Sequence, residues 1–205
     1  MPAKVTNQNH GAIFLADLKR RLFLEGLLVA VPEPDTGDDL WVLDRGIGEQ
    51  EDDDYERPRF FRCQSKSAVS CTMRSGHKVY TVNFTRTYKS RIHQGFYFLI
   101  GIYDRESDKF QVGCFPGEFF QKLKDDGNLR FNEEGRPILD LFVIESDDGC
   151  RKYELRMKYP PRPGKKIGRG PRKDVSEFFA HDSLLEAFAS SSNSRGNQRG
   201  NQGQA

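Results

Sequence analysis

The chain has 205 residues, enough for one domain with a sizeable core and few for two. Its 32 basic and 30 acidic side chains nearly cancel, so the net charge identifies no partner. No segment approaches the roughly 20 apolar residues that cross a bilayer, and the N-terminus lacks a signal-like apolar core. These observations argue against a membrane protein and lead us to expect a soluble, cytoplasmic one.

The four cysteines are widely spaced, and no CxxC pair brings two of them together. Reduced thiols are therefore expected in place of a disulfide framework. Cys63, Cys71 and His77 are the nearest approach to a metal-binding set. Their spacing fits no structural-zinc pattern, which argues against zinc.

A helix is the first element that the sequence predicts. Leu15, Leu18 and Leu22 recur at helical spacing between residues 12 and 25. Gly26 suits the left-handed position that ends many helices, so we expect the helix to stop there.

Extended segments rich in β-branched and aromatic residues follow, separated by turn-forming residues. The segment at 96–103 is almost wholly apolar, as expected for a strand covered on both faces. A short buried strand is expected at 27–32, and a short helix that opens with proline at 116–123. Further strands are predicted at residues 39–44, 59–66, 77–86 and 109–115.

The C-terminal third is predicted to hold a hairpin, an irregular loop, a helix and a tail. Residues 138–145 and 151–158 form the hairpin, joined by SDDG. Prolines and glycines interrupt regular structure at 160–173. Residues 174–189 are expected to form a closing helix. The tail at 190–205 lacks hydrophobic content and is expected to be disordered.

Asp39, Gln64 and Lys66 suggest a site where two neighbouring strands meet. Gln64 and Lys66 project to one side of their strand, and Asp39 begins the preceding strand, which can lie alongside. The Asp39 carboxylate, the Gln64 side-chain oxygen and the Ser65 backbone carbonyl are hard ligands that suit Mg²⁺. Lys66 can position an attacking water beside such a metal and a scissile phosphate.

The order of these residues resembles the PD-(D/E)XK nuclease superfamily, specifically its small endonuclease-like group whose third strand reads QVK. The likeness covers roughly residues 11–123 and implies a restriction-endonuclease-like α/β fold, with a central mixed β-sheet flanked by helices. It also implies a divalent metal, Mg²⁺ or Mn²⁺, and hydrolysis of phosphodiester bonds in nucleic acid. The residues that carry it are Gly11, Gly26, Pro32, Asp39, Leu40, Gln64, Lys66 and Ser67.

One position departs from the family pattern. The family carries a glutamate on the first helix about four residues after the initial glycine, and Leu15 stands there. Asp17, the nearest acid, is rotated by about 200° from Leu15, because a helix turns by about 100° per residue. We expect Asp17 to pair instead with Arg20 or Arg21 on the helix surface.

Simpler interpretations stand beside the metal site. Asp39 lies in DTGDD, which is also an ordinary turn before a strand, and Asp38 can add a carboxylate only if the strand has not yet begun. Gln64 and Lys66 can form the solvent-facing row of an edge strand, where lysine discourages aggregation. The acidic run at 49–56 would repel nucleic acid, so we expect it at the end of the two strands far from Asp39.

Two basic segments are candidates for contact with nucleic acid. Around the strand predicted at 77–86, basic side chains interleave with aromatic ones, which suits phosphate contact and base stacking. Residues 158–173 hold seven basic side chains and no acid, which suits a phosphate backbone. A soluble hairpin face and a solvated loop explain the two segments equally well. The candidate contacts are Arg74, Lys78, Arg86, Lys89, Arg91, Lys165, Lys166 and Arg169.

The sequence thus predicts a single α/β domain over residues 1–189, with a central mixed sheet, an N-terminal helix across one face, and a C-terminal strand hairpin and helix. The predicted function is metal-dependent nuclease activity, with DNA as the expected substrate and a homodimer as an option that the resemblance implies. The alternative is a catalytically inactive protein of the same fold that binds nucleic acid or a partner protein.

Overall fold

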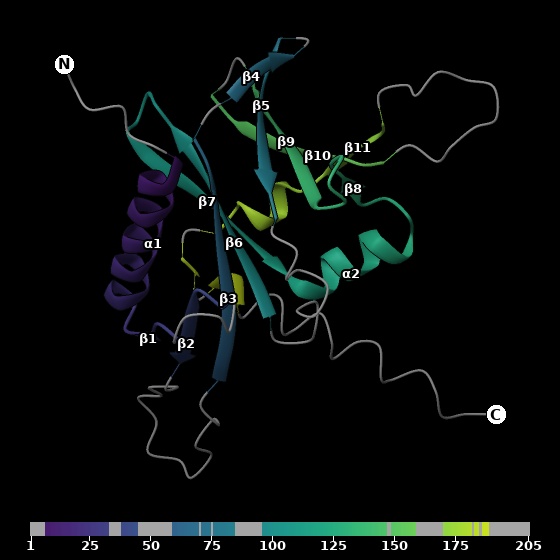
Figure 1. The fold of residues 1–205 in the computed structure, drawn as a ribbon. Coiled ribbons are helices and arrows are strands. Elements are labelled where there is room, and N and C mark those ends of the chain that lie inside the picture. The colour runs from purple at the N-terminus through teal and green to yellow at the C-terminus, as the bar shows by residue number, and fades with distance from the viewer. Residues whose placement is uncertain are drawn as a thin grey trace, which may run out of the picture.

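The structure, a computed structural model, describes most of the chain between residues 7 and 188. Two β-sheets, a long outer helix and a shorter helix make up this part (Figure 1). Among these residues, no helix is long and apolar enough to pass through a bilayer. The described residues are 7–32, 38–44, 59–69, 71–74, 76–84, 96–146, 149–158, 170–181, 183–184 and 186–188.

The predicted N-terminal helix is present and begins earlier than expected, as α1 (Asn7–Leu24). Phe14, Leu18 and Leu22 recur every four residues and are fully buried, so they form the face that packs on the sheet. Gly26 follows the helix with a φ of 78°, the left-handed conformation that glycine adopts without strain.

Sheet A is a mixed five-stranded sheet. In spatial order its strands are β1 (Leu28–Ala30), β2 (Leu40–Asp44), β3 (Arg59–Ala68), β6 (Phe96–Asp104) and β7 (Lys109–Pro116). β3 and β6 are parallel, and the other neighbouring pairs are antiparallel. The expectation of a buried first strand is wrong, because β1 is an edge strand and exposes Leu28 and Ala30.

Sheet B is antiparallel throughout and contains the predicted hairpin, formed by β9 (Pro137–Glu145) and β10 (Arg151–Arg156). The short strand β8 (Arg130–Phe131) also pairs with β9. In spatial order the sheet holds β11 (Arg172–Asp174), β10 (Arg151–Arg156), β9 (Pro137–Glu145), β5 (His77–Asn83) and β4 (Cys71–Arg74).

α1 and sheet B cover opposite faces of sheet A (Figure 1). Leu99 of β6 joins Cys63 in the core beneath α1, whereas its neighbours Phe98 and Ile100 join Leu141 in the core between the sheets. β6 is therefore buried on both faces, as predicted. The α/β class, the mixed sheet and the N-terminal helix across one face are confirmed.

The predicted short helix is α2 (Gly117–Asp125), and Pro116 occupies its N-cap position. The proline suits this place because it has no backbone N–H to leave unpaired. Phe120 and Leu123 on one face of α2 are buried in the core between the sheets. α2 therefore closes that core on the side away from α1.

The continuous closing helix predicted for residues 174–189 is wrong. Asp174 ends β11, a 3₁₀ turn (η2, Ser176–Phe178) follows, and Phe188 lies in a separate helical turn. Val175 is buried in the core between the sheets, whereas Phe188 is buried in the core beneath α1. The two ends of this segment therefore pack into different cores, and the chain between them is not one helix.

Candidate functional site

Asp39 meets β3 where β2 begins. Leu40 lies opposite Cys63 in this antiparallel pair, and the Asp39 backbone N–H donates to the Cys63 carbonyl at 2.9 Å. β3 continues past this point, and the Asp39 carboxylate takes over as its hydrogen-bond partner. Oδ2 of Asp39 accepts from the Ser65 N–H at 2.7 Å and from the Ser65 hydroxyl at 2.8 Å. The predicted placement of Asp39 beside the exit of the next strand is confirmed.

Gln64 and Lys66 project from the face of β3 opposite to the Ser65 hydroxyl. In the parallel pair with β6, Gln64 lies opposite Phe98 and Lys66 opposite Ile100, and both partners belong to the core between the sheets. Gln64 is 5 % exposed and Lys66 is half-buried. β3 lies between β2 and β6, so the alternative of an edge strand with a solvent-facing Gln64 is wrong.

The oxygen atoms around this point fit a hard divalent cation. Both hydrogen bonds from Ser65 end on Oδ2 of Asp39, which leaves Oδ1 for another partner. The Ser65 carbonyl faces the same edge of β3 as its N–H, because the two groups of one strand residue point to the same side. Mg²⁺ keeps several waters and needs only one or two protein carboxylates. Asp39 Oδ1 and the Ser65 carbonyl therefore lie at one edge of β3 and could hold such an ion, whereas the Gln64 side chain projects into the core between the sheets and is not brought to that edge.

Cys63 lies in the same region, but it is a weaker candidate for metal binding than the oxygen atoms. Cys63 is fully buried beside Cys114, and burial, followed by the nearby Cys114, Asp38 and Asp39, raises the pKa of the Cys63 thiol. A thiol of this kind stays protonated at neutral pH and is a poor metal ligand. In the described part of the chain, no three His, Cys, Asp or Glu side chains gather as a metal-binding group.

α1 places an apolar side chain where the resemblance implies an acid. Leu15 is partly buried and packs against the core between α1 and sheet A. Asp17 forms ion pairs with Arg21 at 2.8 Å and with Arg20 at 3.8 Å, as predicted. Neither residue therefore adds a carboxylate beside Asp39.

Asp38 is committed to a buried ion pair and is not available to a metal. Its side chain has no exposed surface, and its Oδ2 accepts from Arg62 Nε at 2.7 Å and from Trp41 Nε1 at 2.8 Å. Arg62 also donates to Oδ1 at 3.2 Å, which makes the contact bidentate. This pair fixes the start of β2 and thereby helps to position Asp39.

β2 and β3 are joined at the end far from Asp39. Asp44 lies opposite Arg59, and their side chains form an ion pair at 2.8 Å. The acidic run at 49–56 lies outside the described residues. This run connects the ends of β2 and β3 that are far from Asp39, as the sequence predicted.

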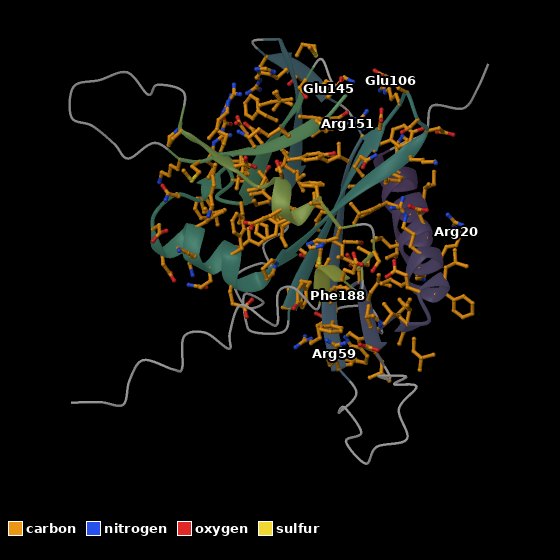
Figure 2. The ribbon with its side chains drawn as sticks, turned by 180° about the vertical axis from the view of Figure 1, so that it is seen from behind. Arg20, Arg59, Glu106, Glu145, Arg151 and Phe188 are labelled. Carbon is orange, nitrogen blue, oxygen red and sulfur yellow. The ribbon has the colours of Figure 1, made fainter. Side chains whose placement is uncertain are left out.

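Lys78, a predicted nucleic-acid contact, is held in a network of ion pairs. Its Nζ donates to Glu106 at 3.1 Å and to Glu145 at 3.4 Å, and the hydrogen bond to Glu106 is the main cause that raises the pKa of Lys78. Arg151 joins the network through Asp104 at 2.8 Å and Glu145 at 3.3 Å. Figure 2 shows Glu106, Glu145 and Arg151 gathered at one end of the molecule. This network makes Lys78 a poor contact for phosphate.

Arg74 is the other predicted nucleic-acid contact within the described residues. Its half-exposed side chain lies 3.8 Å from Asp140. Arg172, from the basic segment at 158–173, and Arg130 and Arg156, which the sequence did not single out, lie in the same region of sheet B. The remaining candidates lie outside the described residues: Arg86, Lys89, Arg91, Lys165, Lys166 and Arg169.

The arginines that were missed left only a weak signal in the sequence. Arg156 alternates with the buried Tyr153 and Leu155, which places it on the outer face of its strand. Its approach to Arg172 depends on a strand pair that closes a long, basic connection, and no local pattern predicts that pair.

Comparisons with protein-family models, curated proteins and solved structures found no match to this chain.

Proposed function

We propose that the protein is a divalent-metal-dependent nuclease with a restriction-endonuclease-like sheet, and that it hydrolyses phosphodiester bonds in nucleic acid, with DNA as the first substrate to test. One observation carries the proposal. The Asp39 carboxylate meets the Ser65 amide and hydroxyl at the start of β2, with Gln64 and Lys66 on the flanking positions of β3. This observation supports the proposal because a carboxylate, a backbone carbonyl and an ammonium group belong to Asp39 and to two consecutive residues of one interior strand.

Each residue has a defined role in this proposal. Asp39 and the Ser65 carbonyl would hold Mg²⁺ or Mn²⁺, and such an ion would supply Lewis-acid activation of a phosphate oxygen and of water. The Ser65 amide and hydroxyl hold the Asp39 carboxylate in one orientation. Lys66, half-buried beside the core, positions the attacking water through its ammonium group.

The experiment is a cleavage assay with purified protein and Mg²⁺ or Mn²⁺. Supercoiled plasmid, single-stranded DNA and RNA are incubated with the wild type, Lys66→Ala and a matched control, Lys109→Ala, an exposed lysine on β7. We expect the wild type and Lys109→Ala to cut at least one substrate and Lys66→Ala to lose cleavage by at least about 100-fold, the usual share of a positioned proton-transfer group.

Two controls separate loss of chemistry from loss of folding. Lys66→Ala must keep the thermal unfolding midpoint of the wild type within a few degrees, and EDTA must abolish cleavage by the wild type. Intact plasmid, single-stranded DNA and RNA after incubation of the wild type with both metals would refute the proposal.

A second candidate function is a non-catalytic nucleic-acid-binding protein of the same architecture. The observation that favours it is the position of Leu15, which packs into the core where the resemblance implies an acid. In that case nucleic-acid binding is unchanged by EDTA, and no metal supports cleavage. The same assay, read with a binding measurement, therefore separates the two candidates.

A further inference from the structure

Four arginines gather on the face of sheet B that points away from sheet A. Asp140 on β9 is their centre: its Oδ1 accepts from the Thr81 hydroxyl at 2.8 Å, and its Oδ2 bonds Arg130 on β8. Arg156 on β10 lies 3.4 Å from the same oxygen, and Arg74 on β4 lies 3.8 Å from it. Guanidinium groups from three strands therefore converge on one carboxylate oxygen.

Aromatic packing fixes the orientation of two of these side chains. Arg172 lies opposite Arg156 in the pair of β10 and β11, and both guanidinium groups stand over the ring of Phe142, at 3.9 Å and 4.8 Å from its centroid. Such stacking restricts a flexible side chain without using its N–H donors. The cluster is thus ordered before any ligand arrives, which lowers the entropic cost of binding.

Positive charge exceeds negative charge within this cluster. The four arginines share two carboxylates, Asp140 and Glu154, and Lys152 also bonds Glu154. Burial lowers the pKa of Arg156; Asp140 opposes this effect, and the nearby arginines add to it. An anion placed here would relieve the repulsion among the guanidinium groups.

The guanidinium N–H groups of Arg74 do not donate hydrogen bonds to Asp140. At 3.8 Å the two side chains form an ion pair that is too long for a hydrogen bond. A guanidinium carries five N–H donors in a planar fork that matches the oxygens of a phosphate. With its side chain 48 % exposed, Arg74 can turn these donors toward a ligand.

The most basic segment of the chain begins and ends at this cluster. β10 ends at Arg156 and β11 begins at Arg172, so residues 157–171, with five basic side chains and no acid, connect them. The Met157 N–H donates to the Pro171 carbonyl at 2.9 Å and closes the connection at its base. So much tethered positive charge favours an extended polyanion over a single small phosphate.

We propose that Arg74, Arg130, Arg156 and Arg172 form a binding site for the phosphodiester backbone of nucleic acid, on a different sheet from the Asp39 site. The choice of nucleic acid as the polyanion rests on the proposed function. The binding itself needs neither metal nor cleavage. The site contacts phosphates and so holds nucleic acid without reading its base sequence.

The test is a fluorescence-anisotropy titration of labelled single- and double-stranded oligonucleotides in EDTA, at several salt concentrations. The variants are Arg74→Gln and Arg172→Gln, with Arg20→Gln on α1 as the matched control, because that side chain is 69 % exposed and lies on the far side of sheet A (Figure 2). We expect each cluster variant to bind about tenfold more weakly, the loss of one charge-assisted hydrogen bond, and Arg20→Gln to bind as the wild type does.

The salt dependence gives a second measurement. Each lost phosphate contact is expected to reduce the slope of log affinity against log salt by about one. If Arg172→Gln unfolds, Arg74→Gln still tests the proposal. Among the described contacts Arg74 makes only the long ion pair with Asp140, so this variant should stay folded.

Three outcomes would overturn this proposal: no binding by the wild type, wild-type affinity in both cluster variants, or competition by polyglutamate that equals competition by unlabelled oligonucleotide. The last would assign the cluster to acidic peptides. The titration contains EDTA and so measures binding without metal. Binding in the titration, together with no cleavage of plasmid, single-stranded DNA or RNA in Mg²⁺ or Mn²⁺, would refute the nuclease and support this site.

Discussion

Asp104 is a buried carboxylate surrounded by donors at the turn between β6 and β7. It is 6 % exposed and accepts from Arg151 at 2.8 Å, from the Glu106 N–H at 3.0 Å and from the Ser107 hydroxyl at 2.9 Å. Burial on its own raises the pKa of this group, but the three hydrogen bonds outweigh burial and lower the pKa of Asp104 below its ordinary value.

This lowered pKa predicts a loss of stability in acid. The unfolded chain binds a proton at Asp104 at higher pH than the folded chain does, so the contribution is complete above the unfolded pKa of about 3.9 and disappears as pH falls through the folded value. We expect Asp104→Asn to reduce the free energy of unfolding by about 1–3 kcal/mol at pH 6 and by much less at pH 2. Urea unfolding at a series of pH values measures this difference.

Asp126→Asn is the matched control, because Asp126 is exposed at the end of α2. Its difference from the wild type should stay small at every pH. A constant difference between the wild type and Asp104→Asn across the acid range would contradict the assigned pKa direction.

Residue-level prediction succeeded where a local rule sufficed. Side-chain alternation and antiparallel pairing placed Asp39 beside the exit of β3, and helical spacing paired Asp17 with Arg21. The sequence did not predict the ion pair of Asp38 with Arg62 or that of Lys78 with Glu145, because these contacts depend on which strands become neighbours.

At the scale of elements, the ring of Phe14 on α1 packs closely against Gly101 on β6. A Cβ on Gly101 would lie 2.4 Å from Cε2 of Phe14, whose side chain is fully buried and packs on the ring of Phe110 at 4.9 Å. The absence of a side chain at Gly101 therefore makes room for the Phe14 ring and allows α1 to pack close to β6.

We predict that Gly101→Ala lowers the free energy of unfolding by about 1–3 kcal/mol, the usual cost of overpacking a core. The control is Gly11→Ala within α1 itself, where an added Cβ meets no atom within 4 Å. That change should raise stability by about 0.5–1 kcal/mol, because alanine favours the helix. Urea midpoints compare the three proteins. Equal midpoints for Gly101→Ala and the wild type would mean that α1 does not pack here as described.

Elements were predictable from the sequence to the extent that their periodicity is local. The leucine spacing revealed α1, the apolar run revealed β6, and the turn SDDG revealed the hairpin of β9 and β10. The last predicted helix failed because its pattern combined residues of two cores. Val175 and Phe188 look like one apolar face in the sequence, yet they lie on opposite sides of sheet A.

At the scale of the whole molecule, the division into two sheets was not predictable. Alternation shows that Tyr80 and Val82 are buried, but not that β5 pairs with β9 in place of a strand of sheet A. Strand partners are chosen by contacts distant in sequence, which a single sequence does not display. This division has a functional consequence, because it puts the proposed metal ligands on sheet A and the arginine cluster on sheet B.

The proposed nuclease requires that Asp39 and its neighbours on β3 hold one divalent ion, and electron paramagnetic resonance of Mn²⁺ measures this binding directly. Free Mn²⁺ gives a signal that is lost when the ion binds protein, so a titration counts the bound ions. We predict one bound Mn²⁺ per chain for the wild type and for Asp17→Asn, a carboxylate on the surface of α1, and none for Asp39→Asn. Equal Mn²⁺ binding by Asp39→Asn and the wild type, or no binding by either, would contradict the proposed site.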